Sequence, residues 1–206
     1  MVNNEHILIV GCGGHAKSCI DVIEEKYKIC GFIGGESDLG KKIFSYDVLG
    51  TDESLCELSK LYRNAFIAVG QIYDSSKKKL LYETIKDYGF CLPTLLSKYS
   101  LISKYSSIGF GTIIMPGVII KAGVEIGDNC IVNSGSIIEH DVQISSHTHI
   151  STGAILNGNV FVGQGSFVGS GSVVREGVKI GENSFIGMGM SIIKNVESEM
   201  KVNRSA

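Results

Sequence analysis

A hydrophobic period of six residues dominates the second half of the chain. From position 102 to position 192 every sixth residue is Ile, Val or Leu, and the pattern holds sixteen times without a break. These three residue types make up roughly a quarter of an ordinary chain, so a run of this length excludes chance. A helix of 3.6 residues per turn cannot present one face at this period, whereas short extended segments separated by corners can. The pattern predicts a repeat protein built of strands.

The length of the repeat sets the geometry of the expected coil. Six extended residues span roughly 20 Å, and a triangle is the smallest closed polygon with such sides. Each coil therefore takes about 18 residues, and the repeats suffice for between five and six coils with the aliphatic residues inside. Glycine follows the aliphatic residue in several repeats, and a small or β-branched residue stands two positions before it. Such residues suit strands and tight corners.

The first half of the chain alternates between strand and helix patterns. HILIVG, KICGFIGG and NAFIAVG are typical of short strands. An amphipathic helix with Cys19, Ile20 and Ile23 on one side follows the first of them, and further helices are expected near 52–62 and 74–88. This order predicts a small parallel sheet in an α/β, Rossmann-like domain over residues 1–92. The all-β repeat domain then covers residues 93–206, with Pro93 at the joint.

A glycine-rich turn lies between the first strand and the first helix. Gly11, Gly13 and Gly14 precede His15, an order that fits the fingerprint in which glycines let a phosphate approach a helix N-terminus. The turn is expected to bind a nucleotide or sugar substrate, with His15 near the ligand. Two alternatives stay open, namely a dinucleotide such as NAD or FAD and a tight turn that binds nothing. A dinucleotide site needs an acidic residue where the second strand ends, and that strand ends in Gly34-Gly35.

Composition narrows the class of partner. The net charge is −2, from 19 basic and 21 acidic residues that are interspersed, so nucleic acid and anionic membranes are not expected partners. The N-terminus lacks a signal-peptide pattern, no apolar run reaches the roughly 20 residues of a membrane span, and we expect a cytoplasmic protein. Six cysteines without a CxxC pair indicate reduced thiols, of which Cys12 is the one expected to be exposed.

Three of the five histidines lie in one stretch, SGSIIEHDVQISSHTHIST. In the repeat register Ile138, Ile144 and Ile150 point inward, so His140 lies at or near a corner and His149 immediately precedes an inward residue. Asp141 follows His140, and a carboxylate beside an imidazole can fix its tautomer and raise its basicity. A zinc site is the rival interpretation, but the offsets of 2, 7 and 9 residues place the histidines on different sides of a coil.

Several segments carry a resemblance to a known family. GCGGHAKSCIDVIE, FIGG, VLGTDESL and VNSGSIIEHDVQISSHTHISTGAILNGNV occur in this order, and together they resemble the bacterial sialic acid O-acetyltransferases and UDP-4-amino-sugar N-acetyltransferases. ISTGAILNGNV is most similar to the sialic acid branch. The resemblance covers nearly the whole chain. It implies a left-handed parallel β-helix with hexapeptide repeats, acetyl-CoA as co-substrate without a metal, and a homotrimer with inter-subunit active sites.

The resemblance also implies roles for individual residues. His140 matches the catalytic base, Asp141 the residue that orients it, and Gly158, one coil further on, a backbone donor to the thioester oxygen. The acceptor would contact Gly11, Gly13, Gly14, His15, Asn133 and His149. The coenzyme would contact His149, Gly158, Gly169, Ser170, Met188 and Gly189.

Two departures from the family pattern affect the expected substrate and affinity. The UDP-amino-sugar enzymes carry an acidic pair where this chain has Gly34-Gly35, which favours sialic acid or CMP-sialic acid as the acceptor, with O-acetylation in capsule or surface polysaccharide synthesis. The family's G-x-P-A-[KR] tail is absent, which predicts weakened coenzyme binding.

Three alternatives remain beside this interpretation. The first is N-acetylation of a nucleotide-linked 4-amino-sugar. The second is a non-catalytic trimeric scaffold, and the third is a metal-dependent hydratase.

Overall fold

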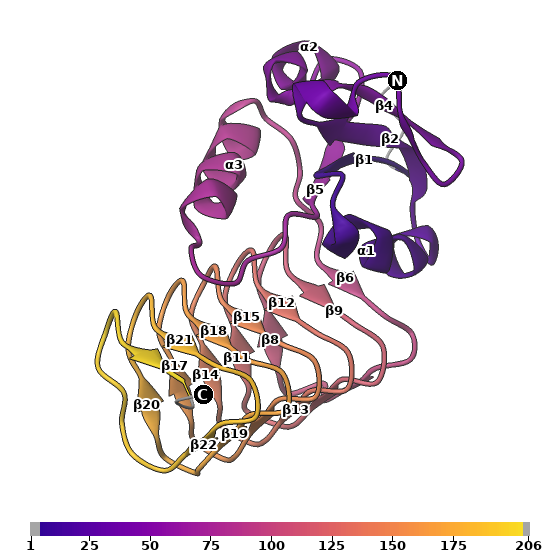
Figure 1. The fold of residues 1–206 in the computed structure, drawn as a ribbon. Helices are drawn as coiled ribbons and strands as arrows, with labels where there is room; N and C mark the ends of the chain where they lie inside the picture. Colours follow the sequence, from indigo (N-terminus) through magenta and orange to yellow (C-terminus); the bar gives the residue numbers. More distant parts are fainter. Residues whose placement is uncertain (1–4, 204–206) are drawn as a thin grey trace. The chain divides into compact units, whose positions relative to one another are not determined.

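The computed structural model describes residues 5–203, which divide into two compact units (Figure 1). The first unit holds the chain up to Gly70 together with Lys77–Pro93, and the second holds Gln71–Ser76 and the chain from Thr94 onward. The expected N-terminal domain included residues 71–76. The structure groups this segment with the second unit instead, because Gln71 and Tyr73 make their contacts there.

The first unit is an α/β domain around a five-stranded sheet with the strand order β3-β4-β2-β1-β5. The strands are β1 (His6–Val10), β2 (Lys28–Gly34), β3 (Lys42–Ile43), β4 (Tyr46–Thr51) and β5 (Asn64–Ile67). All neighbours are parallel except β3 and β4. The two main helices are α1 (Gly14–Glu24) and α3 (Ser76–Asp87). The helix α1 buries Cys19, Ile20 and Ile23, which confirms its predicted inward face.

Two elements of this unit differ from the sequence-based expectation. The strand pair β3 and β4 was not predicted, because β3 is a two-residue strand at the edge of the sheet and most residues of the pair are not buried. The expected helix over 52–62 is shorter than predicted. A 3₁₀ turn at Asp52–Ser54 leads into the single helical turn α2 (Leu55–Leu58).

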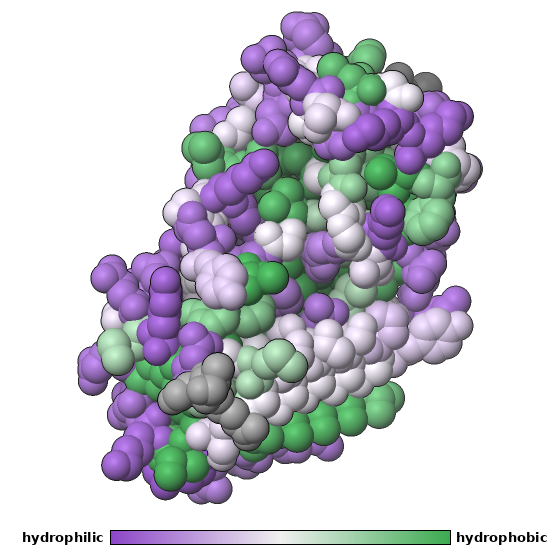
Figure 2. Space-filling model, in the orientation of Figure 1, coloured by the Kyte–Doolittle hydropathy of each residue, from purple (hydrophilic) through white to green (hydrophobic). Residues whose placement is uncertain are grey.

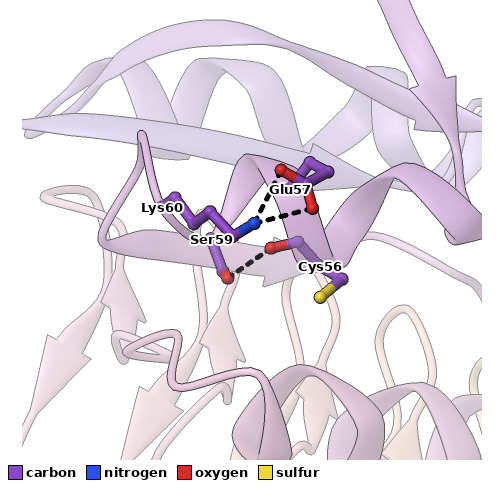
Figure 3. Close-up of polar contacts among 4 residues, drawn as sticks. All are labelled: Cys56, Glu57, Ser59 and Lys60. Carbon is purple, nitrogen blue, oxygen red and sulfur yellow. Dashed lines mark hydrogen bonds and ion pairs between the residues drawn. The ribbon is translucent and has the colours of Figure 1, made fainter.

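Side chains close the end of α2 (Figure 3). The hydroxyl of Ser59 donates to the carbonyl oxygen of Cys56 at 2.8 Å, and Lys60 Nζ lies 2.7 Å from Glu57 Oε1. The ion pair is exposed, and water screens such pairs so that they contribute little to stability.

The second unit is a left-handed parallel β-helix with three flat faces, here called sheets I, II and III. Sheet I holds β7 (Leu101–Ile102), β10 (Ile119–Ile120), β13 (Ile137–Ile138), β16 (Ile155–Leu156), β19 (Val173–Val174) and β22 (Ser191–Ile192). Sheet II holds β8 (Ser107–Ile108), β11 (Glu125–Ile126), β14 (Gln143–Ile144), β17 (Phe161–Val162) and β20 (Lys179–Ile180). Sheet III holds β6 (Leu95–Leu96), β9 (Ile113–Ile114), β12 (Ile131–Val132), β15 (His149–Ile150), β18 (Phe167–Val168), β21 (Phe185–Ile186) and β23 (Lys201–Val202).

The coil has the length that the repeat predicts. Ile119 pairs with Ile137 and Ile137 pairs with Ile155, so equivalent residues of successive coils are 18 positions apart. The last coil is the exception, since Phe185 pairs with Lys201, only 16 residues later. The aliphatic residue of the repeat is buried in every strand from β9 to β22, which confirms the predicted core.

Each corner imposes the same two demands on the sequence. At each corner from Gly111 to Gly189 one residue has a left-handed backbone, and glycine fills most of these positions because it has no Cβ to clash. Asn, Asp and one His take the others. Buried hydroxyls also bridge the coils, each donating to a carbonyl 15 residues further on, as at Ser136, Ser166 and Ser172. These bonds explain the small polar residues two positions before the aliphatic one.

The repeat is visible on the surface as well. Figure 2 shows residues of like hydropathy in rows that run from coil to coil, including a hydrophobic row. The outward positions of sheet I are aliphatic on five successive coils, whereas those of sheet II are mostly polar. Among the described residues no helix is both long and apolar enough to cross a bilayer.

Candidate active site

His140 and Asp141 form a pair at the corner between sheets I and II. The Nδ1 of His140 lies 2.9 Å from Oδ2 of Asp141, and both side chains are exposed. Asp141 takes the left-handed position of this corner, with φ of 58°, which few residues other than Gly, Asn and Asp adopt readily. An ionised carboxylate can only accept, so the bond places a proton on Nδ1 and leaves Nε2 as the acceptor of the neutral ring.

Glycines on the two adjoining coils leave room for this pair. Below, Gly123 lies so close to Asp141 that a Cβ there would overlap the carboxylate. Above, a Cβ at Gly158 would come within 2.6 Å of both Cε1 and Nε2 of His140. The imidazole therefore packs against the backbone of Gly158, as the 18-residue spacing predicts. The backbone N–H of Gly158 makes no hydrogen bond within residues 5–203.

The charges around His140 favour its protonated form. The hydrogen bond that His140 donates to Asp141 is the main reason that the pKa of His140 is raised above its ordinary value, and the negative charges of Asp141, Glu139 and Glu176 add to the effect. Partial desolvation opposes it. A more basic imidazole binds a proton more tightly, as a general base requires.

A pocket of about 460 Å³ adjoins the pair on the outer side of sheet II. The pocket is lined by two columns of residues that run from coil to coil, together with Val160. One column is Asp141, Asn159 and Gly177, and the other is Gln143, Phe161 and Lys179. A carboxylate and an ammonium group thus border a space that also exposes an aromatic ring. The pocket can hold an extended, partly polar molecule beside the histidine.

The other two histidines of the cluster have structural roles. His147 occupies the left-handed position of the next corner, and its Nδ1 lies 2.9 Å from Nδ2 of Asn129, one coil below. His149 belongs to sheet III and is only 7% exposed. The three rings therefore lie on different parts of the coil, and the described residues hold no group of three or more metal-ligating side chains.

His149 is covered by the segment Gln71–Ser76, which sequence reasoning did not anticipate. The Nδ1 of His149 donates to the carbonyl oxygen of Gln71 at 2.6 Å, and the side-chain amide of Gln71 donates to Gly165 O at 3.0 Å. The imidazole meets the ring of Phe167 edge-on, with ring centroids 5.1 Å apart. His149 is therefore packed although it lies outside the interior of the coil, because a segment distant in sequence buries it.

The remaining predicted coenzyme and acceptor residues of this unit gather at a different corner, between sheets III and I. These residues are Asn133, Gly169, Ser170, Met188 and Gly189. Ser170 Oγ lies 2.8 Å from Ser151 Oγ, and Met188 is exposed. Within one chain the structure therefore does not bring these residues to His140.

The glycine turn of the first unit is open on its outer side. Gly11 has φ of +118°, and a Cβ there would meet the backbone of Ala68 at 3.0 Å, so only glycine fits. A Cβ at Gly13 or Gly14 would meet no described heavy atom within 4 Å. His15 directs its Nε2 along α1 to Cys19 Sγ, at 3.4 Å.

Sequence reasoning missed a carboxylate near this turn. The 3₁₀ turn Glu36–Asp38 follows β2, and Asp38 is its last residue. The Oδ2 of Asp38 accepts the backbone N–H of Gly35 at 3.2 Å. Desolvation and then the charge of Asp38 raise the pKa of the Cys12 thiol, whereas Lys41 lowers it. A turn-forming run after Gly34-Gly35 was the available signal.

Cysteine exposure differs from the expectation. All six cysteines are free, but Cys56 and Cys91 are the exposed ones, and Cys12 is only partly exposed. Burial raises the pKa of Cys19 to about 12, which makes that thiol unreactive.

Two known families match the chain. Residues 6–85 match the PglD N-terminal domain, and residues 105–140 and 159–189 match the bacterial transferase hexapeptide, in six repeats. No curated protein matches the chain.

Solved structures match over nearly the full length. The acetyltransferase domain of PglB from Neisseria gonorrhoeae, in complex with acetyl coenzyme A, is 26% identical with a TM-score of 0.88, covering 97% of this chain and 96% of that one. PerB from Caulobacter crescentus, in complex with CoA and GDP-perosamine, is 26% identical with a TM-score of 0.88, covering 96% of this chain and 93% of that one.

A third structure supports the fold alone. WeeI from Acinetobacter baumannii is 22% identical with a TM-score of 0.84, and the match covers 98% of both chains. Residues 6–85 are thus similar to a PglD N-terminal domain and two later segments are similar to bacterial transferase hexapeptide repeats, and the chain is an acetyltransferase.

Proposed function

We propose that this protein transfers the acetyl group of acetyl-CoA to the amine of a nucleotide-linked amino sugar. The observation that carries the proposal is the corner at which Asp141 holds Nδ1 of His140 while the ring packs under Gly158. Similarity to PerB, whose complex holds CoA and GDP-perosamine, favours an amine on a nucleotide sugar over sialic acid.

His140 acts as the general base in this proposal. Its Nε2 removes a proton from the acceptor amine as the nitrogen attacks the thioester carbonyl carbon, and the proton then passes to the departing thiolate. Asp141 keeps the ring in the tautomer that leaves Nε2 free to accept, and it stabilises the imidazolium that forms. A base of this kind contributes on the order of 10² to 10⁴ in rate.

Gly158 supplies the complementary donor. Its backbone N–H has no protein partner within residues 5–203, and it lies one coil above the base. A hydrogen bond from this N–H to the thioester oxygen strengthens as negative charge develops there, which is worth about 10² to 10³ in rate for a single donor. The pocket along Phe161 and Lys179 would hold part of a bound substrate beside the same corner.

The active site is proposed to lie between the subunits of a homotrimer. His140 lies at one corner of the coil, and the predicted coenzyme residues lie at another, so a second copy must supply one of the two groups. The outward aliphatic positions of sheet I offer a surface for that copy. They are Leu101, Ile119, Ile137, Ile155 and Val173. Stable subunit interfaces have apolar cores of this kind.

The first unit is proposed to bind the nucleotide portion of the acceptor. The turn of Gly11, Gly13 and Gly14 leaves open space in front of the N-terminus of α1, where backbone N–H groups favour phosphate. His15 borders the turn, although its Nε2 is directed toward Cys19.

Thiol release from acetyl-CoA tests the reaction. We expect the wild type to release CoA thiol with a UDP- or GDP-linked 4-amino-sugar and His140→Ala to lose that activity. The acetylated product should resist mild alkali, because an amide is stable where an ester hydrolyses. Silence of the wild type with every nucleotide-linked amino sugar would contradict the proposal and favour the scaffold interpretation.

Mixing variants tests the shared site. His140→Ala and Ser170→Trp should each be inactive alone, the second because a bulky ring fills the coenzyme corner. If each site takes its base from one copy and its coenzyme corner from the next, co-refolded mixtures should recover about a quarter of wild-type activity. Recovery of nothing would place both groups in one subunit.

O-acetylation of sialic acid or CMP-sialic acid is the second candidate. The sequence feature that suggested it is Gly34-Gly35, which stands where the UDP-amino-sugar enzymes carry an acidic pair. Turnover with a sialate and an alkali-labile product would establish it, provided that His140→Ala abolishes the same turnover.

A further inference from the structure

The carboxyl end of the parallel sheet in the first unit is a candidate site for recognition of the acceptor. The N–H of Gly11 donates to Ile33 O at 2.8 Å, so the glycine turn that follows β1 lies beside the end of β2. In open parallel sheets, ligands bind outside the carboxyl ends of the strands, and an acidic residue after the second strand commonly contacts a nucleoside there. No acidic residue lies at the last positions of β2, which ends at Gly34.

The structure brings an acidic side chain to that position from further along the chain. The turn Glu36–Asp38 folds back over the end of β2, and Asp38 Oδ2 accepts the N–H of Gly35 at 3.2 Å. A Cβ at Gly34 would lie 2.9 Å from Cβ of Asp38 and 2.7 Å from Sγ of Cys12. Glycine at 34 thus leaves the space in which the Asp38 side chain packs against the turn after β1.

The carboxylate of Asp38 retains capacity for a ligand. Oδ1 lies 3.4 Å from Nζ of Lys41, an exposed side chain, and the Asp38 side chain is 31% exposed. An ionised carboxylate offers about four acceptor sites, of which these two contacts use part. The carboxylate lies beside the glycine turn, since a Cβ at Gly34 would meet both Asp38 Oδ2, at 3.1 Å, and Sγ of Cys12.

This arrangement suits a nucleotide better than a free acidic sugar. A nucleotide would place its phosphates at the glycine turn and the N-terminus of α1, which favour negative charge. Its nucleoside then offers hydrogen-bond donors, either ribose hydroxyls or base N–H groups, to the acceptor oxygens of Asp38. A free sialic acid would instead bring its own carboxylate toward that of Asp38, which is repulsive.

We propose that Asp38 is a specificity-determining residue that accepts hydrogen bonds from the nucleoside of a nucleotide-linked acceptor. The inference rests on the proposed function and deepens it, because it assigns the nucleotide class of the acceptor to a residue of this chain. Asp38 takes no part in the acetyl transfer itself.

Equilibrium binding of UDP, GDP and CMP to the full-length protein, without acetyl-CoA, tests the proposal directly. Asp38→Asn keeps an oxygen for the N–H of Gly35 but replaces the other oxygen by a donor. Glu36→Gln is the matched control, since it removes the same charge from the same turn at an exposed side chain. Thermal melting of both variants checks that the turn change leaves the fold intact.

We expect at least one nucleotide to bind the wild type, and Asp38→Asn to weaken that binding roughly 10- to 100-fold, as loss of a charge-assisted hydrogen bond does. Glu36→Gln should bind within about twofold of the wild type. The 2′-deoxy form of the bound nucleotide separates the two sources of donors. If the deoxy form binds the wild type more weakly than the ribose form does, and this difference is absent in Asp38→Asn, the contact is to the ribose. If both forms bind the wild type equally, the contact is to the base.

Two results would overturn the proposal. One is equal nucleotide binding by the wild type, Asp38→Asn and Glu36→Gln. The other is a wild type that binds free sialic acid but none of the three nucleotides. Because the assay contains no acetyl donor, nucleotide binding that depends on Asp38 in a protein without transferase activity would contradict the proposed reaction and leave this inference standing.

Discussion

Substitution of Gly158 by alanine should disable the enzyme without unfolding it. The new Cβ would stand 2.6 Å from Cε1 and Nε2 of His140 and 3.2 Å from Cδ2. Carbon contacts are favourable only near 3.5 to 4.0 Å, so the ring must move by about 1 Å. The ring atoms that move include Nε2, the proposed proton acceptor.

The expected loss of activity follows from that displacement. A misplacement of about 1 Å can cost on the order of 10²-fold in rate, and complete loss of the base sets a limit of about 10⁴-fold. We therefore expect Gly158→Ala to lower kcat/KM by a factor between about 10² and about 10⁴. Its effect should approach that of His140→Ala.

Stability should change little. The backbone of Gly158 lies outside the left-handed region, so alanine adds no backbone strain and removes freedom from the unfolded chain, which is worth about 0.4 to 1 kcal/mol in favour of folding. The His140 side chain is 66% exposed and can swing into water. The free energy of unfolding from urea melts should stay within about 1 kcal/mol of the wild type.

A double-mutant cycle with thiol release as the assay decides whether the effect passes through the imidazole. In the His140→Ala background the obstructing ring is gone, so Gly158→Ala should have less than about a threefold further effect. Equal losses in both backgrounds would refute the reasoning, because the alanine would then act on the coenzyme or on the backbone donor. Unchanged activity of the single variant would refute it as well.

Three further results are expected. Because Asp141 raises the pKa of His140 and only the neutral ring accepts a proton, the rising limb of kcat/KM against pH should lie above the ordinary histidine value, and Asp141→Asn should move it to lower pH. Ile137→Asp, on the outward aliphatic positions of sheet I, should shift the oligomer toward monomer in sedimentation and abolish activity. Ser166→Ala removes a buried hydroxyl with two hydrogen bonds across the coils and should cost about 1 to 3 kcal/mol in urea melts, whereas Lys60→Ala should cost less than about 1 kcal/mol.

The β-helix could be predicted from the sequence because its constraint recurs at a fixed interval. The aliphatic residue at each inward position and the 18-residue coil follow from strand length and closure alone, and the pairing of Ile119 with Ile137 confirms them. The contact between His140 and Gly158 follows from the same interval. The hand of the coil does not follow from this arithmetic, since a period of six is the same for either hand.

Contacts between segments far apart in sequence were not predictable in this way. The segment Gln71–Ser76 covers His149, and the hydrogen bond is to the backbone carbonyl of Gln71. Because every residue has such a carbonyl, no pattern of residue types predicts this bond. The strands β3 and β4 were missed for a different reason. The strand β3 has only two residues, and β4 buries only two of its six, so the hydrophobic pattern of the pair is weak.

At the end of β2, a comparison of this sequence with the family pattern position by position can give a wrong inference about nucleoside recognition. Gly34-Gly35 suggested that recognition of a nucleoside was lost, because the family pattern has acidic residues at that place. In the structure these glycines remove side chains from the end of the strand, and the turn that follows carries Asp38 into the vacated space. A carboxylate can therefore return to the same edge of the sheet through a different backbone path. Loss of acidic residues at 34 and 35 consequently does not favour a free sialic acid over a nucleotide-linked sugar.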